Sequence, residues 1–122
     1  MSAFRLLGIA VPLLLLLGCA TTHQRYDWGK YESSLYVYYK NPASEAQFVQ
    51  SLQDLLATAN TTGRPVPPGI YAEYGYLLMQ EGKSKDAITA FKHEEDHWPQ
   101  SKYFMDQMMK AAASGDRTPK GS

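Results

Sequence analysis

The apolar residues of this chain recur every three or four positions along several stretches, which is the spacing of one face of an α-helix. The first such set is Trp28, Tyr31, Leu35 and Tyr38. It predicts a helix that ends at Asn41-Pro42, because a residue before proline avoids the helical conformation. Residues 35–39 are also rich in tyrosine and valine, which favour strands, so a single strand there stays open as an alternative.

A second helix is predicted to begin at Ser44, where Gln47 three residues later completes the spacing of a capping box. Its apolar stripe consists of Val49, Leu52, Leu55, Leu56 and Ala59. Residues 61–68 then contain three prolines and a glycine, which predict a hinge or an extended connector.

Two further helices are predicted to form a hairpin. The first begins near Pro68 and runs over residues 70–80, with Gly82 placed to take the left-handed conformation after its end. The second is predicted to be capped by Ser84 and to end before Pro99. Its buried face is predicted to carry Ala87, Ile88 and Phe91.

A final helix is predicted to be capped by Ser101 and to close at Gly115. One side of it carries Phe104, Met105, Met108, Met109 and Ala112. Residues 115–122 are expected to be a disordered tail. Together these patterns predict an all-α fold of antiparallel helical hairpins over residues 27–114.

Residues 1–18 have the pattern of a secretory signal peptide. Arg5 is their only charged residue, and the apolar run after it has about 12 residues, fewer than the roughly 20 that span a bilayer. The run ends in Leu16-Leu17-Gly18-Cys19, which resembles the bacterial lipobox. That resemblance implies lipid attachment to Cys19 and, since Ala20 rather than Asp follows, delivery to the outer membrane. Residues 19–26 would then form a tether.

Composition narrows the possible function classes. The chain has 122 residues with 12 Lys+Arg and 12 Asp+Glu, so no overall basic charge favours nucleic-acid binding. Cys19 is the single cysteine and cannot form an internal disulfide, so lipidation would account for its presence in an exported chain. Without residues 1–18 the chain keeps 104 residues and a formal charge of −1.

Small and aromatic residues occupy a set of spaced positions after the proline-rich break: Tyr71, Tyr74, Gly75, Leu78, Ala87, Phe91 and Pro99. This spacing resembles one tetratricopeptide repeat, a helix–turn–helix unit, over residues 68–99. Gly75 and Ala87 would let the two helices approach closely, and Phe91 would fill the space between them. One repeat cannot bury both of its faces, so the neighbouring helices or a second chain must cover it.

The resemblance weakens near the end of the second helix of this unit. Repeats carry small or aliphatic residues there, whereas this chain has Glu94, Glu95 and His97. Trp98 would supply the missing apolar contact.

The concave side of the first helix of such a repeat would carry the candidate partner-binding residues Ala72, Tyr76, Met79 and Gln80. Tyrosine and methionine are well suited to protein interfaces. The alternative is that these side chains pack against residues 28–60 in an aromatic-rich core. The core interpretation is favoured, and the recognition surface stays open.

Residues 93–97 read His-Glu-Glu-Asp-His and match the H-E-x-x-H pattern of zinc proteases. His93 and His97 would share a helix face and could bind zinc, with Glu94 as the general base. However, the two middle positions of that helix are normally uncharged, no histidine follows as a third ligand, and Trp98-Pro99 ends the helix. We therefore predict no enzyme, no metal site and no cofactor, with adventitious or regulatory metal binding at the two histidines as the alternative.

Three further segments carry a second resemblance: Trp28-Gly29-Lys30-Tyr31-Glu32, Tyr38-Tyr39-Lys40-Asn41-Pro42, and Pro99-Gln100-Ser101 with Phe104-Met105. They are similar to a family of small bacterial lipoproteins of unknown function, whose members are often encoded beside a lipoprotein similar to the curli secretion channel. The resemblance implies such a lipoprotein as a candidate partner, and a periplasm-facing, lipid-anchored location. We expect a protein-binding accessory subunit of an envelope or secretion assembly. The alternative is a structural envelope lipoprotein without a specific cargo.

Overall fold

The computed structural model describes residues 24–115, and these residues form helices joined by short connections. The α-helices are α2 (Tyr31–Lys40), α3 (Glu45–Thr62), α4 (Ile70–Gln80), α5 (Ser84–His97) and α6 (Lys102–Ala113). Short 3-10 turns, η2 (Pro42–Ser44) and η3 (Pro99–Ser101), precede α3 and α6. The all-α prediction is confirmed for the described residues, and the strand alternative at 35–39 is wrong because this run lies inside α2. No helix among the described residues is long and apolar enough to cross a bilayer.

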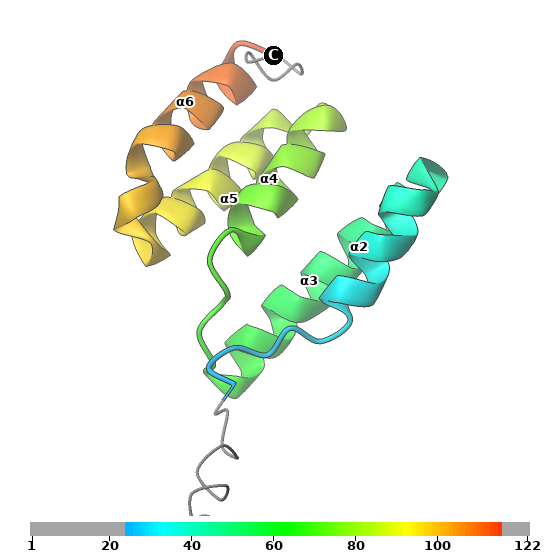
Figure 1. Ribbon diagram of the computed structural model, residues 1–122. Coiled ribbons are helices and arrows are strands. Elements are labelled where there is room, and N and C mark those ends of the chain that lie inside the picture. The colour runs from blue at the N-terminus through cyan, green and yellow to red at the C-terminus, as the bar shows by residue number, and fades with distance from the viewer. Residues whose placement is uncertain (1–23, 116–122) are drawn as a thin grey trace, which may run out of the picture.

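The helices form two antiparallel hairpins and one additional helix (Figure 1). In the first hairpin α2 lies along α3, and in the second α4 lies along α5. The remaining helix, α6, packs on α5 at the end of the array away from α2. Helices α2 and α6 are therefore the two ends of the array. Within the described chain, each of them is covered by other helices on one side only.

Helix α4 lies between two clusters of buried apolar side chains. The first cluster joins α3 to α4 and includes Phe48, Leu52, Tyr71 and Leu77. The second cluster joins α4 to α5 and α6 and consists of Leu78, Met79, Ala87, Phe91, Met105 and Ala112. The partly buried ring of Tyr74 packs against both clusters, so α4 connects the first hairpin to the rest of the molecule.

The α4–α5 hairpin has the close approach that the repeat pattern predicts. A Cβ atom added to Gly75 would lie 2.7 Å from Cε1 of Phe91 and 3.2 Å from the backbone oxygen of Ala87. Real Cβ atoms almost never lie within 3.0 Å of another heavy atom, so only glycine fits here without a shift of its neighbours. Gly82 follows α4 with φ of 80°, the left-handed conformation expected after a helix end.

Ser44 and Ser101 occupy the predicted N-cap positions of α3 and α6, but the predicted side-chain caps are wrong at all three helix starts. Neither Ser44 nor Ser101 makes a side-chain cap; their hydroxyls instead donate backwards to the carbonyls of Asn41 and Trp98, at 2.7 and 2.6 Å. The 3-10 turns in front of α3 and α6 bring those carbonyls within reach. Ser84 is already the first residue of α5.

Two other boundaries differ from the sequence prediction. Helix α3 continues through Thr62 and stops at Gly63, whose φ is 67°, so the break begins two residues later than predicted. On α6, Met105 and Ala112 are buried as predicted, but Phe104 keeps 60% of its surface exposed. The ring of Phe104 leaves the core because α5 contacts only one side of α6.

The N-terminal predictions fall almost entirely outside the described residues. The signal peptide at residues 1–18, the lipid site at Cys19 and residues 116–122 of the predicted tail all lie there. The described end of the predicted tether, however, packs on the fold. The ring of Tyr26 makes edge-on contacts with Trp28 and Trp98, each with a centroid distance of 6.2 Å.

Candidate functional site

The four predicted partner-binding residues lie on α4, but they do not form an open surface. Met79 is buried in the cluster that α4 forms with α5 and α6. Ala72 and Tyr76 are partly buried against the same cluster, and Gln80 is partly exposed. Ala72, Tyr76 and Met79 therefore pack on the cluster that α4 forms with α5 and α6.

The most exposed apolar side chains of the first hairpin lie on the outer side of α2. Tyr36, Val37 and Tyr39 keep 63%, 46% and 78% of their surface exposed. The ammonium group of Lys40 lies 5.7 Å from the ring centroid of Tyr36 and 5.8 Å from that of Tyr39. We call Tyr36 and Tyr39 the α2 aromatic face, whereas Val37 lines a surface depression with Ser44 and Ser51.

The opposite side of α2 is held firmly on the core. The ring of Tyr38 stacks on Phe48 with a centroid distance of 5.2 Å, and the hydroxyls of Ser34 and Ser51 lie 2.7 Å apart. The hydroxyl of Tyr38 also donates to the Glu45 carboxylate at 3.1 Å. Because these contacts fix the rotation of α2, the α2 aromatic face has a defined direction away from the core.

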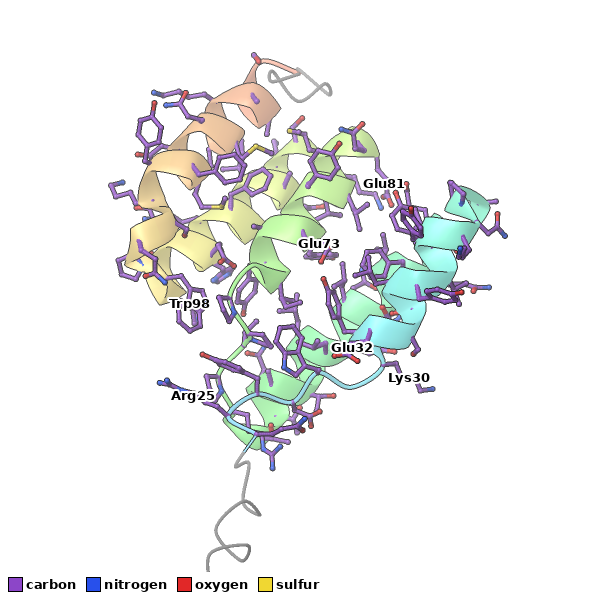
Figure 2. All side chains as sticks on the ribbon, in the orientation of Figure 1. Arg25, Lys30, Glu32, Glu73, Glu81 and Trp98 are labelled. Atoms are coloured by element: carbon purple, nitrogen blue, oxygen red, sulfur yellow. The ribbon has the colours of Figure 1, made fainter. Side chains whose placement is uncertain are left out.

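A hydrogen bond also ties α2 to the second hairpin. The hydroxyl of Tyr31 donates to Oε2 of Glu73 at 2.7 Å, and Figure 2 shows Glu73 between α4 and α2. Burial raises the pKa of Glu73 above its ordinary value, an effect that the hydrogen bond from Tyr31 partly opposes. Burial and the Glu73 carboxylate together raise the pKa of the Tyr31 hydroxyl well above its ordinary value.

The sequence analysis did not identify the α2 aromatic face, although its signal is present in the sequence. The core-facing residues Tyr31, Leu35 and Tyr38 follow the helical period, so apolar residues at intervening positions must point elsewhere. Helix α2 has ten residues, and Tyr36, Val37 and Tyr39 lie outside its apolar stripe. The core does not need these three apolar side chains, so they are expected on the surface. A smaller exposed pair, Tyr103 and Phe104, lies at the start of α6.

The two histidines of the H-E-x-x-H pattern are exposed at the end of α5. Both rings contact the ring of Tyr71, with centroid distances of 5.2 Å for His93 and 5.3 Å for His97, and they lie 6.3 Å from each other. Nδ1 of His97 lies 2.7 Å from the backbone oxygen of His93. Burial, and then the nearby charge of Glu94, raise the pKa of the Tyr71 hydroxyl.

Glu94 does not lie where a general base would. Its side chain is only 3% exposed, and its Oε1 accepts a 2.7 Å hydrogen bond from the backbone N–H of Gly69 at the start of α4. Within residues 24–115, no group of three or more His, Cys, Asp or Glu side chains is arranged to hold a metal ion. The geometry therefore assigns Glu94 a structural contact.

Comparison with known proteins gives one match. Residues 25–108 match the family described as Domain of unknown function (DUF4810). The chain belongs to this family. The DUF4810 match covers α2, α3, α4 and α5 and continues into α6. The first core cluster, the α2 aromatic face and all buried members of the second cluster except Ala112 lie within it. Searches of curated proteins and of solved structures returned no match.

Proposed function

We propose that this DUF4810 protein is a lipid-anchored lipoprotein of the bacterial outer membrane, and that it binds another envelope protein on the periplasmic side. In this role it is an accessory subunit of an envelope or secretion assembly. The α2 aromatic face carries the protein-binding part of the proposal. The lipobox-like sequence at Cys19 carries the anchor.

The physical argument for a protein partner starts from exposure. Scattered apolar residues are normal on a protein surface, but neighbouring large side chains on one rigid helix are less so. Tyr36 and Tyr39, three positions apart on α2, each expose more than half of their surface. Tyrosine is enriched at protein interfaces because it buries a large area with few rotatable bonds. The contacts of Tyr31 and Tyr38 already fix α2, so binding would require little further ordering of the helix.

The identity of the partner follows from the family resemblance and not from geometry. A lipoprotein similar to the curli secretion channel is the first candidate, because the small lipoproteins that this chain resembles are often encoded beside one. Such a partner would be in the same membrane, within reach of a protein anchored by Cys19.

Capture from membranes tests the proposal. The full chain is isolated with its bound proteins from native membranes, alongside a Tyr36→Ser/Tyr39→Ser variant. A Tyr103→Ser variant serves as a matched control, because it removes an exposed tyrosine from α6. We expect one envelope protein to be recovered with the wild-type chain and the control, and to be lost with the α2 variant while helical circular dichroism is unchanged.

Two results would contradict the proposal. If the same amount of the envelope protein is recovered with the Tyr36→Ser/Tyr39→Ser variant, the α2 aromatic face is not part of the binding site. Recovery of no specific protein with any form would favour a structural lipoprotein without cargo. The anchor is tested separately by the mass of the peptide that carries Cys19, which must include the attached acyl chains.

A further inference from the structure

The outer side of α2 carries an acidic residue, a basic residue and an aromatic ring between them. Glu32 and Lys40 lie four positions before and four positions after Tyr36, so the three side chains form one row along the helix. All three are exposed. Figure 2 shows Glu32 at the start of α2, and Lys40 is the last residue of the helix. The row is therefore symmetric in position about Tyr36 and opposite in charge at its two ends.

The two charged groups of this row have no ion-pair partner in their own domain. Within residues 24–115 neither the Glu32 carboxylate nor the Lys40 ammonium makes an ion pair. Lys40 lies instead over the rings of Tyr36 and Tyr39, at 5.7 and 5.8 Å from their centroids. No helix of the described chain covers this side, because α2 packs on α3 at the end of the array (Figure 1). Both charges are therefore available to a molecule that binds from outside.

The row is complementary to itself when a second α2 helix lies against it in the opposite direction. A two-fold axis through Tyr36 places each residue opposite the one that lies equally far on the other side of position 36. Glu32 then faces Lys40 of the second copy, and this ion pair occurs twice. The two Tyr36 rings meet at the axis, where a pair of aromatic rings packs favourably.

Tyr39 lies opposite a small residue in this register. Position 39 faces position 33 of the second copy, and Ser33 is exposed. The hydroxyl of Ser33 already donates to the backbone oxygen of Lys30 at 2.9 Å, so a ring laid over it leaves no unpaired donor. The ring of Tyr39, which is 78% exposed in a single copy, is thereby covered. Side-chain size and charge therefore indicate the same antiparallel register.

We infer that, in the absence of the envelope protein, a second copy of this chain occupies the α2 aromatic face through an antiparallel α2–α2 contact. The inference rests on the proposed function, because it adds regulation to the same face. One α2 helix cannot bind a second copy and the envelope protein at once, so the dimer is the resting form of a chain that has not met its partner.

The size of the contact makes the dimer weak enough to be displaced. One pair of ten-residue helices buries less surface than a stable dimer needs, so the two copies exchange readily. An anchor at Cys19 would confine both copies to one membrane and raise their effective concentration. The contact would therefore shield the exposed tyrosines until the envelope protein replaces the second copy.

Cysteine crosslinking tests the register with the full chain as cells produce it. The chain is purified free of other proteins in a non-ionic detergent and oxidised, and linked peptides are identified by mass, so that any crosslink through Cys19 is recognised. Tyr36→Cys should crosslink to itself, because position 36 lies on the axis. Tyr39→Cys should not, because the two copies of position 39 lie about 9 Å apart along the helices. Mixed Ser33→Cys and Tyr39→Cys chains should crosslink, whereas Tyr103→Cys, at an exposed site on α6, is the control that should not.

Charge reversal tests the two ion pairs by sedimentation equilibrium over a series of concentrations. Glu32→Lys or Lys40→Glu alone should weaken the dimer about tenfold, because each change replaces two attractive exposed pairs with two repulsive ones. Glu32→Lys/Lys40→Glu restores both pairs in reverse and should recover most of the affinity. Asp96→Lys makes the same charge change at an exposed site on α5 and should have no effect.

Three results would overturn the inference: a wild-type chain that stays monomeric throughout the concentration series, a double reversal as weak as the single ones, or equal self-crosslinking of Tyr39→Cys and Tyr36→Cys. These measurements contain only this chain and so do not depend on the envelope protein. A dimer, together with membrane capture that recovers no partner, would uphold the α2–α2 contact and contradict only the proposed function. A monomeric chain that captures the envelope protein would do the reverse.

Discussion

The carboxylate of Glu94 accepts a hydrogen bond from the backbone N–H of Gly69, which lies 25 residues earlier in the chain. Gly69 directly precedes α4, and the first N–H groups of a helix have no partner within the helix. Glu94 therefore caps α4 from α5. This contact explains why a charged residue stands where tetratricopeptide repeats carry a small or aliphatic one.

Replacing Glu94 by alanine should lower the free energy of unfolding by about 0.5–2 kcal/mol, because the N–H of Gly69 at the start of α4 would lose its cap. Glu94→Gln keeps an oxygen acceptor and should cost less than Glu94→Ala. Urea denaturation followed by circular dichroism measures both. Asp96→Asn, at an exposed site on the same helix, is the control and should change little. Equal stability of Glu94→Ala and the wild type would show that the cap contributes nothing.

Gly75→Ala should destabilise the protein by about 1–3 kcal/mol, although alanine is the better helix former. The added Cβ would lie 2.7 Å from Cε1 of Phe91 and force that ring to move. Thermal or chemical unfolding measures the loss. The cost of Gly75→Ala should shrink in a Phe91→Leu background, where the clashing ring is gone. A cost that is the same in both backgrounds would place the strain elsewhere.

The partly buried carboxylate of Glu73 should make stability depend on pH. Its pKa is raised in the folded protein above the ordinary value of 4.5, so the folded state holds the proton more tightly than the unfolded state. Its contribution to stability is fully present below pH 4.5 and is lost as the pH rises through the raised value. The unfolding free energy of the wild type minus that of Glu73→Gln should therefore fall between acidic and neutral pH. The control is the same comparison between the wild type and Glu32→Gln at an exposed site, which should change little with pH. If the wild-type minus Glu73→Gln difference in unfolding free energy rises with pH, the raised pKa of Glu73 is contradicted.

The exposed histidines should not hold a catalytic metal. We expect the full chain, purified without chelators, to contain zinc well below one equivalent by elemental analysis. His93→Ala/His97→Ala should lose the ring contacts with Tyr71, each about 0.5–1.5 kcal/mol, and the exposed contact between Nδ1 of His97 and the backbone oxygen of residue 93. It should still bind the partner protein. One equivalent of zinc that disappears in the double variant would reinstate a metal site.

The helices and the central hairpin were predictable because local spacing encodes them. Apolar residues three or four apart, interrupted by proline and glycine, determine where each helix lies. The contact between Gly75 and Phe91 was also predictable, because the repeat motif places a small residue on one helix opposite a large ring on the next.

The remaining features depend on contacts that spacing does not encode. Glu94 reads as a solvent-facing charge until its partner Gly69 is known, and that partner comes from the linker before α4. The sequence predicts side-chain caps at Ser44 and Ser101 because the 3-10 turns before α3 and α6, which redirect their hydroxyls, leave no clear sequence signature. Likewise, the direction of Tyr36 and Tyr39 depends on which side of α2 meets α3.

The most direct test of a protein-binding α2 aromatic face is photo-crosslinking in living cells. A photoreactive phenylalanine analogue is placed at position 36 or 39, or at position 85 as a control, in the full chain under native expression. We predict one discrete adduct of the same partner from positions 36 and 39, and none from position 85. No adduct from α2, or the same adducts from all three positions, would contradict the account.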